Sequence, residues 1–141
     1  MTMRVYGRVY RDGKHWLVEI PLLDAMTQGR TRKEAYAMAE DLVETLVARR
    51  GFKTRVYPGK GGEFELAGAP TRLLIALVLR RQREASGLSL AEVAHRLKAK
   101  SRNSYARYEQ GVSVPTIEKL NDLLRVVTSG RDVVLRLSDA A

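Results

Sequence analysis

The chain has 141 residues, of which 45% are hydrophobic, and it carries a formal net charge of +9. This hydrophobic fraction is typical of a globular protein and excludes a disordered chain. The absence of cysteine excludes a disulfide framework and a thiolate metal site. Without a long apolar run or a signal-peptide core, we expect a soluble cytoplasmic protein, and its positive charge favours an anionic polymer as partner.

The chain begins with a predicted β-hairpin. Residues 5–10 are β-branched and aromatic, Asp12-Gly13 is a turn signal, and residues 16–20 form the second strand. Pro21 ends that strand because it cannot donate to a ladder. Residues 25–29 are expected to add a third short strand.

A helix is expected next. Thr31 and Glu34 form a capping box, and apolar residues with helical period follow. We expect a strand at 53–57, a turn at 58–62 and a short edge strand at 63–66. The first half is therefore predicted as βββαβ or an order close to it, a small antiparallel sheet with one helix on its face.

The first half also resembles a known family. After the hairpin come Ile20-Pro21-Leu22-Leu23, then Thr27-Gln28-Gly29-Arg30-Thr31, then Glu34-Ala35. This order resembles the N-terminal domain of HicB-type antitoxins over residues 3–66, although many members carry Asp-Leu-Pro-Gly near residues 22–26. The resemblance implies a partial RNase H-like fold without nuclease activity that binds a small HicA-type toxin, itself an RNase.

The acids of this half do not indicate an enzyme. RNase H chemistry needs carboxylates that converge on metal ions. No pair has a spacing that forces convergence, and His15 beside Trp16 is a surface residue in a turn. We therefore expect no catalytic residues, no metal and no cofactor. The acids considered are Asp12, Glu19, Asp24 and Asp41.

A break at Ala67-Gly68-Ala69-Pro70 predicts a linker at 68–70 between a domain at 1–67 and a second at 71–128. The second domain is expected to hold four helices. The first runs from Thr71 to about residue 86, the second follows a Ser89/Glu92 capping box, the third begins at Ser101, and the fourth spans 116–127.

The second and third of these helices form a predicted helix-turn-helix with a basic turn. Residues 69–141 hold 13 Lys and Arg against 7 Asp and Glu, whereas residues 1–68 hold 12 against 9. The unit resembles the Xre/lambda-repressor-like helix-turn-helix family. That resemblance implies a structural pair between Arg83 and Glu109. The chain departs from the family at Leu90, where a glutamine is usual, and in a longer turn, Lys98-Ala99-Lys100, that lacks glycine.

Residues near the start of a recognition helix reach base edges. Arg102 is expected to bind guanine and Asn103 adenine, with Ser104 as a secondary candidate. Arg107 is expected at a base or a phosphate, and Tyr105 and Tyr108 are expected in the core. The expected phosphate contacts are Arg96, Lys98 and Lys100.

The last segment, 129–141, is predicted to contain a strand at 132–137 that serves as a candidate dimerisation element. A lone strand leaves unpaired backbone groups, so it should pair with the same strand of a second chain or with the first domain.

Together these features predict an α+β protein: a small antiparallel sheet with one helix, an all-α helix-turn-helix domain and a C-terminal strand. We interpret it as a HicB-like antitoxin that neutralises a HicA-type mRNA interferase and represses its own operon by binding operator DNA as a homodimer or tetramer. The alternative is a stand-alone transcriptional regulator whose first domain serves dimerisation or ligand sensing. The expected toxin-binding acids are Glu34, Glu40, Asp41 and Glu44.

Overall fold

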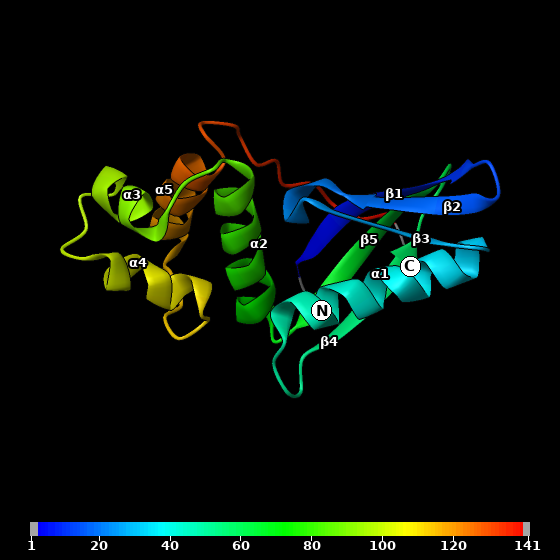
Figure 1. The fold of residues 1–141 in the computed structure, drawn as a ribbon, viewed down its shortest axis with the longest axis horizontal. Coiled ribbons are helices and arrows are strands. Elements are labelled where there is room, and N and C mark those ends of the chain that lie inside the picture. Colours follow the sequence, from blue (N-terminus) through cyan, green and yellow to red (C-terminus); the bar gives the residue numbers. More distant parts are fainter. Residues whose placement is uncertain (1–2, 140–141) are drawn as a thin grey trace. The chain divides into compact units, whose positions relative to one another are not determined.

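The computed structural model describes residues 3–139, which form two compact units (Figure 1). Unit 1 comprises residues 3–74 and 137–139, and unit 2 comprises residues 75–136. No helix among the described residues is long and apolar enough to cross a membrane.

Unit 1 contains β1 (Arg4–Asp12), β2 (His15–Ile20), a 3-10 turn (Pro21–Leu23), β3 (Ala25–Gly29), α1 (Arg32–Val47), β4 (Lys53–Pro58) and β5 (Glu63–Ala69). The remaining helices are α2 (Thr71–Ala85), which contains the division between the units, α3 (Leu90–Arg96), α4 (Arg102–Glu109) and α5 (Ile117–Val127).

The five strands of unit 1 form one antiparallel sheet in the order β3-β2-β1-β5-β4. α1 lies across one face of this sheet (Figure 1). β1 shows why, because Val5 and Val9 are buried while Arg8 between them is exposed, which is the alternation of a half-buried strand. The predicted mixture of helices with an antiparallel sheet is confirmed.

The strand expected at 63–66 forms, but it is not a short edge strand, because β5 runs to Ala69 and lies between β1 and β4. The expected order βββαβ left this strand out. Its central residues are buried, as befits a strand paired on both sides. The observed order in unit 1 is therefore βββαββ.

The predicted linker at 68–70 is also wrong in part, because Gly68 and Ala69 are the last residues of β5. The small residues of the sheet make room for aromatic rings. A Cβ on Gly68 would lie 2.6 Å from the ring of Phe52, and a Cβ on Gly7 would lie 2.2 Å from the ring of Phe64. A local composition that suggested a chain break instead marks close packing.

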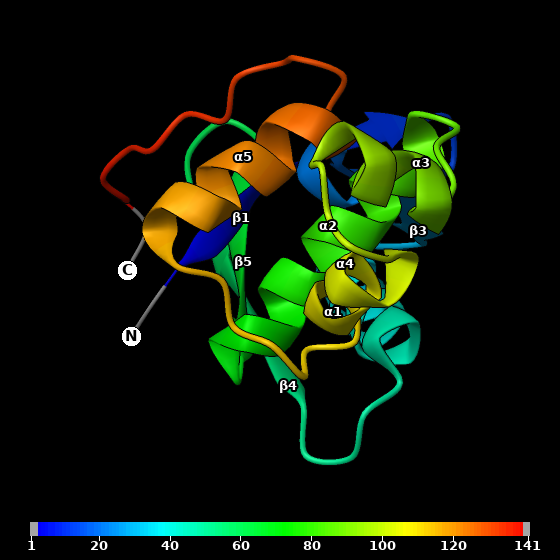
Figure 2. The ribbon, with the colours of Figure 1, turned by 90° about the vertical axis from the view of Figure 1, so that its left-hand side faces the viewer.

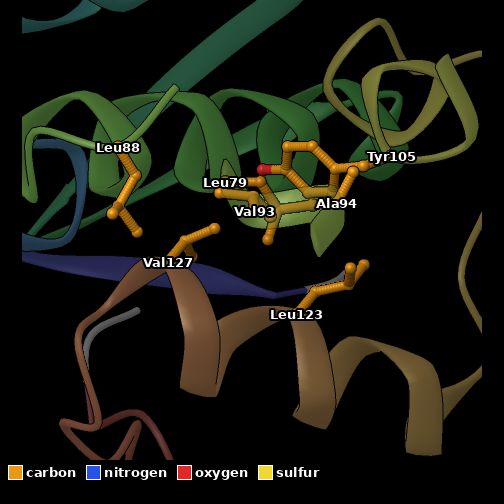
Figure 3. Packing of buried hydrophobic residues seen from close by; sticks show 7 residues of the cluster. All are labelled: Leu79, Leu88, Val93, Ala94, Tyr105, Leu123 and Val127. Carbon is orange, nitrogen blue, oxygen red and sulfur yellow. The ribbon is translucent and has the colours of Figure 1, made fainter. Parts of the chain in front are cut away.

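Unit 2 is built around one apolar cluster contributed by all four helices and the α2–α3 connection (Figure 3). Tyr105 of α4 is 1% exposed and Ala94 of α3 is 4% exposed, so the two short helices pack closely against α2 and α5. Ile117, the first residue of α5, is 83% exposed. The cluster comprises Leu79, Leu88, Val93, Ala94, Tyr105, Leu123 and Val127.

The predicted C-terminal strand at 132–137 does not pair with the first domain of the same chain. Residues 131–139 contain neither helix nor strand, and residues 140–141 lie outside the described part of the chain. Val134 and Leu135 are 81% and 90% exposed. The apolar pattern was typical of a strand, but a strand exists only where a second strand accepts and donates its backbone hydrogen bonds.

Candidate nucleic-acid interface

α3 begins at a complete capping box. Ser89 Oγ accepts a hydrogen bond from the Glu92 backbone N–H at 3.0 Å, and the Glu92 carboxylate accepts one from the Ser89 N–H at 3.1 Å. These two bonds satisfy N–H groups that a helix start otherwise leaves unpaired. The hydrogen bonds from Ser89 lower the pKa of Glu92. The sequence signal at this position therefore fixes where α3 starts.

The turn between α3 and α4 contains a strained residue. Lys98 has a φ of 56°, in the left-handed region that favours glycine. Its backbone N–H donates to His95 and that of Ala99 donates to Ala94, so the turn is closed by backbone hydrogen bonds. Lys98 thus provides both the reversal of the chain and an exposed positive charge.

α4 is anchored from its inner side. Tyr105 is buried in the cluster of unit 2, and burial raises the pKa of its hydroxyl, so the side chain stays neutral. Tyr108, expected in the core, is half-buried and packs against the same cluster. The outer side of α4 is exposed.

Arg83 of α2 and Glu109 of α4 form a two-pronged ion pair. Arg83 Nε donates to Glu109 Oε2 at 2.7 Å and Nη2 donates to Oε1 at 3.1 Å, while Nη1 donates to the Leu88 carbonyl at 2.9 Å. The hydrogen bond to Glu109 raises the pKa of Arg83. One guanidinium therefore ties the end of α4 to α2 and to the α2–α3 connection.

The three residues expected at base edges lie together in the first turn of α4, and all are exposed (Figure 2 views unit 2 from the side of α3 and α4). Ser101 stands at the N-cap but makes no side-chain cap hydrogen bond, and its hydroxyl lies 3.4 Å from that of Ser104. The amides of the first turn are therefore not covered by the cap side chain. The exposed first-turn residues are Arg102, Asn103 and Ser104.

The basic residues around this turn are also exposed. Arg107 donates from Nε to Ser113 Oγ at 3.3 Å, a contact that sequence reasoning missed because the partner lies in the loop after α4. Within residues 3–139, none of the five forms a salt bridge, so their positive charge is available to an anion. The five are Arg96, Lys98, Lys100, Arg102 and Arg107.

The four acids expected on α1 do not form one surface. Glu40 accepts a hydrogen bond from the Val56 backbone N–H at 3.1 Å and is half-buried, so it holds β4 to α1. Glu34 and Asp41 are exposed and lie two helical turns apart, on the same side of α1. Glu44 is half-buried. Sequence periodicity did not reveal that Glu40 accepts a hydrogen bond from a backbone N–H of β4.

The described residues contain no group of three His, Cys, Asp or Glu side chains that could hold a metal ion. Comparison with known proteins identifies one family. Residues 74–137 match a family described as a helix-turn-helix domain, and the match includes α3, the turn and α4. No curated protein matches the chain. The family match and the exposed basic surface together support a DNA-binding helix-turn-helix in unit 2.

Proposed function

Because residues 74–137 form a helix-turn-helix domain, we propose that the protein is a transcriptional repressor that binds a double-stranded operator as a homodimer. The observation that carries this proposal is the exposed basic set on the α3–α4 turn and the first turn of α4. A recognition helix needs a rigid support to insert side chains into the major groove. Tyr105 and the Arg83–Glu109 pair supply that support.

The side chains divide into two proposed roles. Arg102 and Asn103 read base edges, with Ser104 beside them, because Arg binds guanine and Asn binds adenine in a bidentate manner. Lys98, Lys100 and Arg96 bind phosphates, which position the protein without specifying sequence. Arg107 binds a phosphate or a base one turn further along α4.

The test is selection of binding sites from a random DNA pool, followed by affinity measurements at several salt concentrations. Arg102→Ala should cost about 1–3 kcal/mol and relax one base position. Lys98→Ala should weaken all sequences alike and reduce the salt dependence by about one phosphate contact. Lys14→Ala, an exposed charge in the β1–β2 turn, is the control and should change neither. Failure to select any sequence would overturn the proposal.

We further propose that the repressor is an antitoxin acting in the cytoplasm, in which unit 1 binds a small HicA-type toxin and the helix-turn-helix represses the shared operon. The resemblance of residues 3–66 to HicB-type antitoxins supports this, as does the antiparallel sheet with α1 on its face. Neutralisation would be steric, by covering the active face of the toxin. No catalytic step or cofactor is assigned to this chain, and purified protein with magnesium or manganese should cleave neither RNA nor DNA.

The antitoxin proposal is tested by co-purification with the product of the adjacent gene and by a growth test of that gene alone. A tightly bound small protein that is toxic only without this chain is the expected result. Glu34→Lys with Asp41→Lys should weaken binding, since both acids are exposed on one side of α1. Glu118→Lys in α5 is the matched control. No binding and no toxicity would leave the alternative, a stand-alone regulator whose first unit serves dimerisation or ligand sensing.

A further inference from the structure

The two outer strands of the sheet differ in how they are protected. An exposed strand edge offers unpaired backbone groups to any other strand, and charged residues and proline discourage such pairing. β4 carries both devices, with Lys53, Arg55 and Pro58 in six residues. β3 carries neither, since Ala25–Gly29 contains no charge and no proline. No strand in the described part of the chain pairs with the outer edge of β3.

The sequence of β3 and its flanks is complementary to itself. In an antiparallel pair of two copies centred on Thr27, Met26 lies opposite Gln28 and Ala25 lies opposite Gly29. The two residues just outside the strand are Asp24, which has a left-handed φ of 47°, and Arg30, so opposite charges flank both ends of the paired segment Ala25–Gly29. Both are exposed, and Met26 is 61% exposed. Opposite charges that face each other across an antiparallel pair of strands stabilise it.

We propose that the outer edge of β3 is an interface with a second copy of the chain, in which the two β3 strands pair antiparallel about a twofold axis at Thr27. Such an interface is isologous, with the same residues contributed by each copy. Main-chain hydrogen bonds provide the affinity, and the opposite charges of Asp24 and Arg30 at both ends of the paired strands favour this register. The proposed pairing rests on the repressor function in one respect: that function explains why two helix-turn-helix units are brought together.

The chain has no cysteine, so single cysteines can map this pairing. Residues directly opposite in an antiparallel pair have Cα atoms about 4.5–5.5 Å apart, within disulfide reach. A mixture of full-length Met26→Cys and Gln28→Cys chains, treated with a mild oxidant, should give a mixed disulfide dimer. Met26→Cys alone should react slowly, because its own copies would be roughly 7–8 Å apart. Arg55→Cys, in the protected strand β4, is the matched control. A mixed dimer that forms no faster than the Arg55→Cys dimer would overturn the proposal.

A charge exchange tests the same register without cysteine. Arg30→Asp would place two acids together at each end, and the midpoint concentration of self-association should rise roughly tenfold in sedimentation experiments. Asp24→Arg combined with Arg30→Asp should restore it. Equal association of the single and double variants would contradict the pairing. Operator binding by Arg30→Asp at high protein concentration separates the two ideas: if cross-linking fails and the operator is still bound, the interface is wrong and the repressor stands.

Discussion

The Arg83–Glu109 pair is expected to be the main polar support of α4. The side chains are only 15% and 6% exposed, and two hydrogen bonds join them. Glu109→Gln keeps the shape but removes the negative charge, leaving the Arg83 guanidinium largely desolvated. Breaking a buried pair costs about 3–5 kcal/mol. Because Arg83 keeps its bond to the Leu88 carbonyl and some exposure, we expect about 2 kcal/mol.

Thermal unfolding followed by helical circular dichroism measures this loss. For a unit of this size, about 2 kcal/mol corresponds to a fall in melting temperature of roughly 10 °C. The matched control is Glu84→Gln, because Glu84 pairs with Arg80 at 3.7 Å and its side chain is 50% exposed. That substitution should cost less than about 0.5 kcal/mol.

A double variant separates the ion pair from general packing. Arg83→Met combined with Glu109→Met removes both charges, so no buried charge is left without a partner. We expect this variant to be more stable than Glu109→Gln alone. The coupling energy, which compares the double variant with its two single methionine variants, should be at least about 1 kcal/mol. The reasoning is refuted if Glu109→Gln costs no more than Glu84→Gln, or if the double variant loses the sum of the single losses.

Three further predictions concern backbone, packing and pH. Lys98→Gly should stabilise unit 2 by about 1 kcal/mol in thermal melts, because glycine adopts the φ of 56° without strain. The same substitution should weaken DNA binding, because it removes a positive charge. An unchanged melting temperature would contradict the strain at Lys98. Gly7→Ala should destabilise unit 1 by about 2–3 kcal/mol in urea unfolding followed by tryptophan fluorescence, since its Cβ would lie 2.2 Å from the Phe64 ring; a neutral effect would show that the ring can move. The lowered pKa of Glu92 means that its bonds to Ser89 stabilise α3 above the ordinary value of 4.5, and this stabilisation is lost as pH falls through the folded-state pKa. Glu92→Gln should therefore melt below the natural protein at about pH 7, and the difference should shrink as the pH falls through the folded-state pKa of Glu92; a difference independent of pH would argue against the linkage.

The sequence by itself determined the helix-turn-helix. The domain contains a capping box at Ser89 and buried residues at Ala94 and Tyr105, which are separated by helical spacings. Each of these signals depends only on residues within one or two helical turns. At the start of α1, Thr31 Oγ1 accepts a hydrogen bond from the Glu34 N–H at 3.0 Å, which is one of the two bonds of the expected capping box. Signals of this kind need no distant partner, so they can be read directly from the order of residues.

Only the tertiary structure decided how far β5 extends, where it lies in the sheet and which polar residues are structural. β5 lies inside the sheet because Leu66 pairs with Val5 in β1, some sixty residues earlier, and its glycine accommodates a ring. Glu40 supports β4, because its carboxylate accepts a hydrogen bond from the Val56 N–H. The segment at 132–137 has strand-like residues but no ladder in this chain. The backbone N–H and C=O groups of a helix bond to one another within the helix, whereas those of a strand need a second segment. The local sequence does not show which segment that is.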